Sequence, residues 1–153
     1  MKKFTLYSWI TSKAIMDVWV AKEDWPFRYR IAVDKAMEEG IDLCGANLKQ
    51  ADLSGIHVEG VALVSCNLSM ANLTNAWLVR ADLEDANLLM TNLTKANLTK
   101  ANLTGTILRQ ANLTKANFTE ACLVRANLED AISTEVNLYR TNLYRTKFGV
   151  SKK

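Results

Sequence analysis

Large apolar residues recur at every fifth position from Leu43 to Phe148 without one insertion, which gives 22 units. Leu occupies 18 of these centres, so the period is sustained by one residue type, and the four exceptions are Val58, Phe118, Ser133 and Phe148. Only Ser133 places a polar group at a centre. Such self-similarity at a fixed period predicts a solenoid, in which each unit is one structural step.

The other positions of each unit are also constrained. Two residues before each centre the side chain is small, with Ala in 13 of the 22 units, and the residue between them is Asn or Asp in 15. A period of five matches neither an α-helix at 3.6 residues per turn nor a strand at 2. We therefore expect each unit to turn a corner, with four units closing one rung, the small and large apolar residues inside, and the other three residues outside. Rungs stacked at about 4.8 Å would pair their backbone groups as neighbouring strands do.

The pattern Ala-(Asn/Asp)-Leu-x-x, as in 81–83, 96–98 and 126–128, resembles the pentapeptide-repeat family over residues 41–150. This resemblance implies an all-β solenoid, a right-handed quadrilateral β-helix with twenty residues per rung. The units would then form about five and a half coils and a rod of about 25 Å.

Residues 1–40 lack the repeat and predict an N-terminal cap. Alternating apolar residues from Phe4 to Ile10 and from Ile15 to Val20 indicate a β-hairpin. Asp24 and Pro26 are start signals for a helix over about 26–39, and Gly40 is a stop signal. An exposed end rung requires such a cap. A separate partner-binding role for the segment's tryptophans stays open: Trp9, Trp19 and Trp25. The arrangement also resembles the leading segments of phage and prophage members of the family.

Composition gives little support to membrane insertion or catalysis. The net charge is only +3, well short of the basic excess of a phosphate-binding surface. Polar residues between Thr11 and Asp17 interrupt any leader-like apolar core, so we expect a cytoplasmic protein without a membrane span.

The one histidine, His57, lies at an outward position near Glu59, and no metal-ligand spacing or phosphate loop is present, so we expect no cofactor and no enzyme. The period places Cys66 inward and Cys44 and Cys122 outward, far apart, as free thiols.

The outward residues predict where a partner would bind. Five apolar residues at outward positions form the candidate partner-binding face: Trp77, Val79, Leu89, Met90 and Ile107. Five carboxylates form a candidate acidic surface spread over two faces: Asp82, Glu84, Asp85, Glu129 and Asp130. Three lysines form a mild basic spot: Lys95, Lys100 and Lys115. Columns of Asn, such as Asn97 with Asn117, have a structural role on the simplest interpretation.

The leading functional hypothesis is a non-enzymatic scaffold that presents a rigid face to a protein partner, such as a host protein modulated by a phage. The alternative, implied by the resemblance, is DNA mimicry against a type II topoisomerase such as gyrase. Mimicry requires dense negative charge, and the repeat region is net positive. The small basic spot argues against direct nucleic-acid binding.

The repeat runs to Phe148 with only a tail at 151–153, so we expect the last rung to pair with a second copy as a homodimer. Aromatic and Arg residues near this end are candidates for the interface: Tyr139, Arg140, Tyr144, Arg145 and Phe148.

Overall fold

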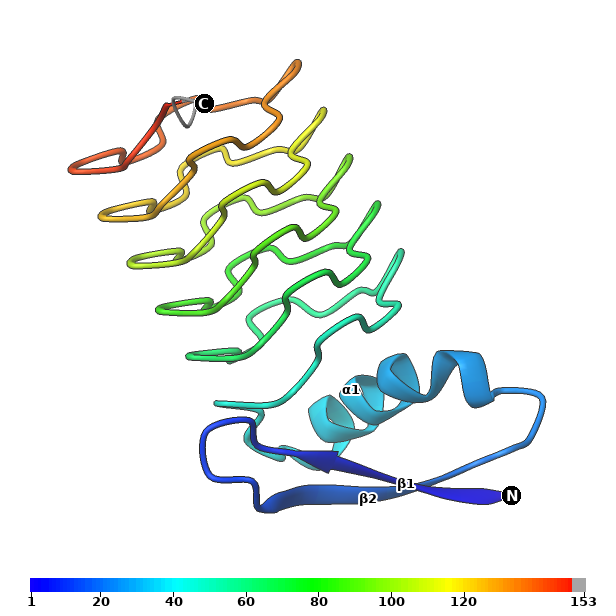
Figure 1. Ribbon diagram of the computed structural model, residues 1–153. Helices are drawn as coiled ribbons and strands as arrows, with labels where there is room; N and C mark the ends of the chain where they lie inside the picture. The colour runs from blue at the N-terminus through cyan, green and yellow to red at the C-terminus, as the bar shows by residue number, and fades with distance from the viewer. Residues whose placement is uncertain (150–153) are drawn as a thin grey trace.

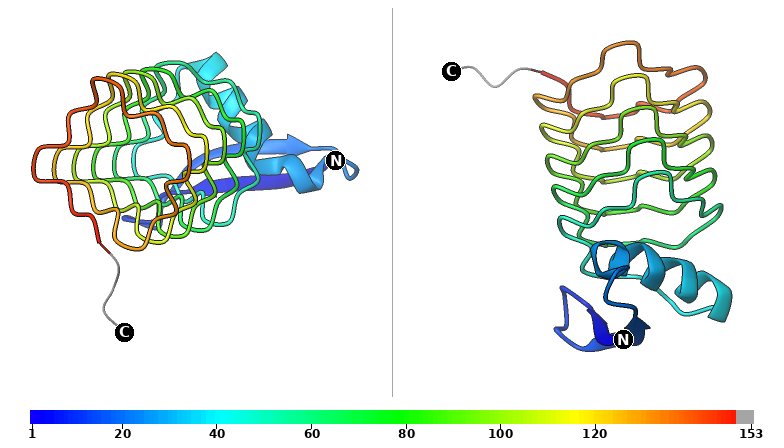
Figure 2. Two further views of the ribbon diagram at one scale, coloured as in Figure 1. Left: turned by 90° about the horizontal axis from the view of Figure 1, so that it is seen from above. Right: turned by 90° about the vertical axis from the view of Figure 1, so that its right-hand side faces the viewer.

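The computed structural model describes residues 1–149; residue 150 and the tail 151–153 lie outside this part of the chain. The repeats form a four-sided coil whose rungs stack away from a hairpin and a helix at the N-terminal end (Figure 1). Seen from above, the chain winds in stacked four-sided turns around a common interior (Figure 2).

Parallel bridges join each rung to the next. They pair residues twenty positions apart, from Asn47 with Asn67 to Asn127 with Lys147. In each bridge the two rungs exchange bonds: Leu48 N donates to Asn67 O at 2.8 Å, and Asn67 N donates to Ala46 O at 3.0 Å. This ladder meets the requirement that buried backbone groups be paired, as the period predicts.

A tight turn at every corner explains why the unit has five residues. In most units the amide that opens the unit donates to the preceding centre, as Ala46 N does to Leu43 O at 2.9 Å. The residue two positions after each centre, from Gly45 to Arg145, has a φ between +54° and +70°. A positive φ at the third residue is typical of a type II turn. Glycine, which adopts this conformation without steric cost, stands at only four of these corners: Gly45, Gly55, Gly60 and Gly105.

The small and large apolar residues of the units form one continuous buried column. Ala46, Leu48 and Phe118 are fully buried, and the same holds for the equivalent residues of the other inner rungs. Thr91 and Thr106 replace Ala at inward positions and are fully buried. Their hydroxyls donate to carbonyls of the preceding rung, at 2.7 Å for Leu68 O and 2.9 Å for Leu83 O. Each hydroxyl is therefore satisfied inside the core.

Where a unit has Asn or Asp before its centre, that side chain caps the next turn. Asn97 Oδ1 accepts from Thr99 N at 3.1 Å and from Thr99 Oγ1 at 2.6 Å. Asn117 repeats this geometry one rung further on, and its Nδ2 donates to Thr99 Oγ1 at 3.1 Å. The side chain holds a backbone amide that would otherwise lack an acceptor, which explains the preference for Asn and Asp.

The first forty residues contain the predicted hairpin and helix. Strand β1 (Lys2–Tyr7) pairs antiparallel with β2 (Ala14–Val20), with an irregularity at Leu6/Tyr7. A short 3₁₀ turn, η1 (Trp25–Phe27), precedes α1 (Arg28–Glu39), which ends at Gly40 in the left-handed conformation. The predicted helix start is wrong by two residues, because Pro26 falls in the 3₁₀ turn and the Asp24 side chain makes no capping bond.

The hairpin and α1 are bonded to the first rungs. Trp9 N donates to Gly45 O at 2.9 Å, and Trp9 Nε1 donates to Ser65 O at 2.6 Å. Helix α1 buries Ala32, Val33 and Ala36, and Arg30 Nη1 on its flank donates to Ser54 O at 3.1 Å. These bonds tie the non-repeat segment to the open edge of the coil.

Two of the three N-terminal tryptophans have structural contacts. The Trp9 indole makes the bond to Ser65 O, and the Trp25 ring lies 6.2 Å from Phe4, with the Arg28 guanidinium 5.4 Å above it. Trp19 is the exception, since 65% of its surface is exposed.

Candidate functional site

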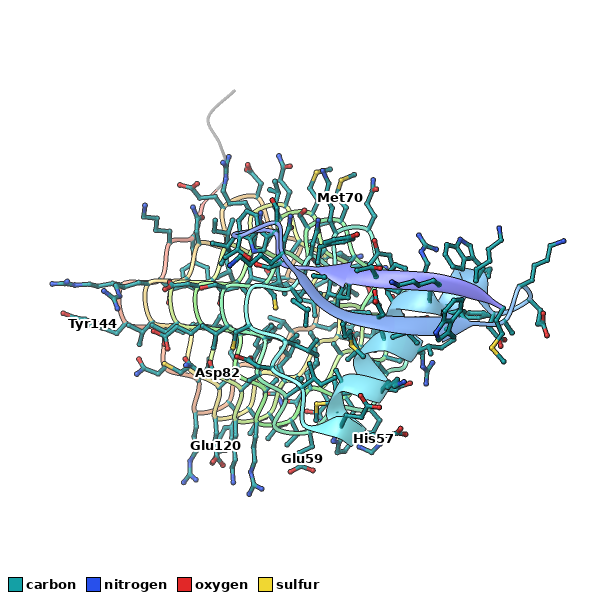
Figure 3. The ribbon with its side chains drawn as sticks, turned by 90° about the horizontal axis from the view of Figure 1, so that it is seen from below. His57, Glu59, Met70, Asp82, Glu120 and Tyr144 are labelled. Carbon is teal, nitrogen blue, oxygen red and sulfur yellow. The ribbon has the colours of Figure 1, made fainter. Side chains whose placement is uncertain are left out.

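The predicted partner-binding face is divided between two opposite sides of the coil. Trp77 lies in the column of His57 and Asn97, whereas Ile107 lies in the column of Asn87 and Asn127. These columns are ten residues apart, which is half of a twenty-residue rung. Figure 3 shows the same separation, with Met70 on one side and Glu59 and Glu120 on the other. The five residues therefore do not form one surface.

The larger apolar group, which we call the methionine face, comprises Met70, Leu89, Met90 and Ile107. Met70 N donates to Leu89 O at 2.9 Å, so these residues occupy adjacent rungs. Met70, Met90 and Ile107 are 46%, 50% and 41% exposed. Sequence reasoning missed Met70, although its position twenty residues before Met90 placed it beside that residue.

Polar groups border the methionine face. Arg109 Nε forms an ion pair with Glu129 Oε2 at 3.4 Å on the same side of the coil. Gln50 Nε2 approaches Met70 Sδ at 3.9 Å, and Asn87 Oδ1 accepts from Leu89 N at 3.0 Å. An apolar centre with a polar border is the usual anatomy of a protein interface.

The opposite side carries a smaller group around Trp77. The His57 ring meets the Trp77 ring edge-on, with centroids 5.2 Å apart. Val79 is half-buried there, and Arg80 Nη1 pairs with Glu59 Oε1 at 3.3 Å. His57 is exposed, as its outward position predicts, and its contact with Trp77 is one of surface packing.

The basic spot is weaker than its three lysines suggest. Lys100 Nζ lies 3.6 Å from Glu120 Oε2, and Lys115 Nζ lies 3.6 Å from Glu135 Oε2. Each glutamate comes from the next rung, twenty residues on. Two of the three lysines are thus paired with a carboxylate, and Lys95 is the one of the three without an ion pair among residues 1–149, which gives little support to binding of nucleic acid.

The five predicted carboxylates also have different surroundings. Asn102 Nδ2 donates to Asp82 Oδ1 at 3.0 Å and to Glu84 Oε2 at 3.3 Å. Within residues 1–149, no Lys or Arg forms an ion pair with Asp82, Glu84 or Asp85. Glu129 is paired with Arg109, and Asp130 lies on the neighbouring side, where its amide donates to Gly149 O at 2.9 Å. The continuous negative surface is thus limited to one corner.

The last described rung leaves the interior of the coil open. Leu138 and Leu143 are only partly buried, Ser133 is exposed, and Phe148 is 56% exposed. A cavity of about 250 Å³ opens between the inward residues of this end, with Phe118 and Phe148 in its wall. We call this region the C-terminal opening.

Two Tyr–Arg pairs lie at outward positions of the last described units. The Arg140 guanidinium lies 5.4 Å from the Tyr139 ring, and that of Arg145 lies 5.1 Å from the Tyr144 ring. Both tyrosines are largely exposed. Of the predicted dimer residues, Phe148 lies in the wall of the cavity, whereas the two exposed Tyr–Arg pairs do not line it.

The three cysteines are free and chemically unequal. Cys66 lies in the core, where its thiol donates to Leu43 O at 2.9 Å and burial raises its pKa to about 12. Cys44 is exposed, and its pKa is raised by partial desolvation and by its hydrogen bond with Asp42. Within residues 1–149, no group of three His, Cys, Asp or Glu side chains could hold a metal ion, and no helix is long and apolar enough to cross a membrane.

Comparison with known structures identifies the class of coil. A pentapeptide-repeat protein, Rfr23, from the cyanobacterium Cyanothece 51142 aligns with 84% of this chain and 99% of its own, at 28% identity and a TM-score of 0.60. A pentapeptide-repeat protein from Nostoc Pcc 7120 aligns with 77% of this chain and 93% of its own, at 23% identity and a TM-score of 0.53. These likenesses make the coil a right-handed quadrilateral β-helix. No curated protein matches the chain in sequence.

The family model for pentapeptide repeats matches three overlapping segments, residues 66–101, 91–130 and 111–149. Together these segments span more than half of the chain. With the twenty-residue bridges and the buried Ala and Leu columns, this match shows that the chain belongs to the pentapeptide-repeat family.

Proposed function

We propose that the protein is a non-enzymatic scaffold that binds a protein partner through the methionine face. The observation that carries this proposal is the exposure of Met70, Met90 and Ile107 together on adjacent rungs of one side. Proteins of the family are in general non-enzymatic structural scaffolds. In the proposed role, the hairpin and α1 cap about five and a half coils, and the rest of the rod holds the binding side rigid.

The physical properties of the methionine face fit a protein partner. Methionine side chains adapt to an irregular surface and are enriched in interface cores, together with other large apolar groups. The backbone beneath them is fixed by the rung ladder, for example by Met90 N donating to Arg109 O at 2.9 Å. Little backbone order would then be lost on binding, which lowers the entropic cost of association.

The test compares two sides of the same rod. Immobilised wild-type protein, a Met90→Lys/Ile107→Lys variant and a Trp77→Lys/Val79→Lys control would each be exposed to an extract of the native host. Quantitative mass spectrometry of the retained proteins should show a partner that the first variant loses and the control keeps. If wild type and both variants retain the same proteins, the methionine face is not the binding surface.

The C-terminal opening motivates a homodimer as part of the proposal. A second copy would cover the apolar surface that Leu138, Leu143 and the cavity leave exposed. The exposed rings of Tyr139 and Tyr144 would lie at the edge of this interface. Burying apolar area contributes about 25 cal/mol per Å² before the costs of association.

DNA mimicry against a type II topoisomerase is the weaker candidate. One observation favours it, the corner where Asp82, Glu84 and Asp85 lie without a cationic partner among the described residues. Against it, Glu129 is ion-paired, and Lys–Glu pairs balance the charge on neighbouring sides. A surface that replaces a duplex requires charge along its length, because the competing site binds many phosphates. A supercoiling assay with purified gyrase distinguishes the two candidates.

A further inference from the structure

A groove runs between β2 and α1 at the N-terminal end, and no residue of the methionine face lines it. Its volume is about 360 Å³, and its lining consists of Val18, Trp19, Ile31, Asp34, Lys35 and Glu38. The four helix residues recur at i, i+3, i+4 and i+7, so one flank of α1 forms one wall. The edge of β2 forms the other wall.

The edge of β2 has free backbone groups. In the part of the chain that the structure describes, the sheet has two strands and β2 pairs only with β1. Its other edge therefore presents amide and carbonyl groups without a strand partner, which is the template for adding a third strand. In Figure 3 the hairpin lies beside α1 at the near end of the rod.

The helix wall of the groove is negative. Glu38 has no ion pair or hydrogen bond among the described residues, and Asp34 Oδ2 is only loosely paired with Arg30 Nε at 3.8 Å. Lys35 is compensated by Glu39 at 3.5 Å. Burial raises the pKa of Asp34, Arg30 opposes this shift, and the nearby Glu38 charge adds to it. Among the described residues, the charge of Asp34 is therefore only weakly compensated and that of Glu38 has no ion-pair partner.

Trp19 adds an apolar surface at the rim. Val18 and Val20, on either side of it, are buried against the interior, so the Trp19 side chain lies on the outer face of the hairpin. Trp9 and Trp25 are held by contacts within the fold, whereas Trp19 remains 65% exposed. Its exposed indole is therefore available to a partner that enters the groove.

We propose that an extended segment of a partner protein, with Lys or Arg at alternate positions, adds a third strand to the free edge of β2 and lies in this groove. Side chains alternate along a strand, so inward residues of the segment would reach Asp34 and Glu38, and outward residues would pack against Trp19. Main-chain bonds supply affinity, and the carboxylates select a basic segment. This site does not depend on the proposed function, because the methionine face takes no part in it.

The experiment uses the full chain and a fluorescein-labelled peptide, Thr-Val-Lys-Val-Lys-Val-Thr, read by fluorescence anisotropy. We expect saturable binding that weakens in about 0.5 M salt, since exposed charges are then screened. Glu38→Lys should weaken binding about tenfold, because it removes an attraction and adds a repulsion. Trp19→Ala should weaken it by a factor of about three, because the valine side chains of the peptide lose an exposed apolar contact. Tyr7→Ala, an exposed aromatic on β1 outside the groove, is the matched control and should bind as wild type.

Two further peptides separate strand addition from charge attraction alone. A peptide with both lysines replaced by glutamate should not bind, and a lysine peptide N-methylated at alternate residues should bind about tenfold more weakly, because it cannot complete the ladder. Equal binding of the lysine and glutamate peptides, or of wild type and Glu38→Lys, would overturn the proposal, as would unchanged affinity of the methylated peptide. Self-association of the protein that Trp19→Ala abolishes would instead make a second copy the occupant. Circular dichroism of each variant establishes that the fold is retained.

Discussion

The capping role of Asn97 predicts a specific loss of stability. In Asn97→Ala, Thr99 N loses its acceptor at 3.1 Å and Thr99 Oγ1 loses its acceptor at 2.6 Å. Each hydrogen bond contributes about 0.5–1.5 kcal/mol net, and both groups are only partly buried, so the variant should lose about 1–2 kcal/mol. Asn97→Asp keeps the oxygen, as Asp82 does when it accepts from Glu84 N at 3.2 Å, and should lose less than about 0.5 kcal/mol.

Urea unfolding followed by circular dichroism measures this difference. For a chain of this size the m-value is about 2 kcal/mol per M, so the midpoint of Asn97→Ala should fall by about 0.5–1 M while m stays constant. The aspartate variant is the matched control, since it changes charge but not the acceptor. Equal midpoints for the alanine variant and wild type, or an aspartate variant as unstable as the alanine one, would refute the capping argument for the repeat pattern.

Three further predictions address the cysteines, the oligomeric state and the charge pattern. With a pKa of about 12, only about one in ten thousand Cys66 thiols is ionised at pH 8. Iodoacetamide should therefore label Cys44 in the folded protein and Cys66 only after unfolding. Mass spectrometry that finds folded Cys66 labelled as fast as Cys44 would contradict the burial of Cys66. Light scattering at tens of micromolar should give the mass of two chains for wild type and of one chain for Leu138→Arg, and a single-chain mass for wild type would dispose of the dimer. Purified gyrase should supercoil DNA equally with and without the protein over a wide concentration range; inhibition that Glu84→Lys/Asp85→Lys relieves would show that the one acidic corner suffices for mimicry.

The repeat region was predictable from the sequence because its signal is local and periodic. The centres at five-residue spacing fix which side chains lie inside, and a step of twenty fixes which outward residues are neighbours, as the columns of Asn97 and Asn117 confirm. The family assignment is likewise confirmed. The phage origin, the cytoplasmic location and the dimer stay predictions.

The surface was harder to predict because pairing depends on where flexible side chains reach. The same twenty-residue step that stacks Lys100 on Glu120 neutralises a predicted basic residue, and only the structure shows the contact. Residue type alone puts Trp77 and Ile107 in one apolar set, although the two columns lie on opposite sides of the coil. In the cap, the helix start at Arg28 depends on a 3₁₀ turn that the Asp24 and Pro26 signals do not distinguish from an α-helix.

The left-handed corners described for the coil leave the four ridges of the rod open to change. Glycine occupies only four of the corners from Gly45 to Arg145. At the other corners a residue with a side chain adopts a positive φ, which costs about 1 kcal/mol relative to the right-handed conformation. Glycine at such a site avoids this steric strain in the folded state. It also raises the conformational entropy of the unfolded chain, which lowers stability by a similar amount, about 0.5–1 kcal/mol. Because these effects nearly cancel, the identity of a ridge residue has little influence on stability. Substitutions at positions such as Met70, Lys95 and Arg125 can therefore give the rod a new partner without first requiring a more stable core.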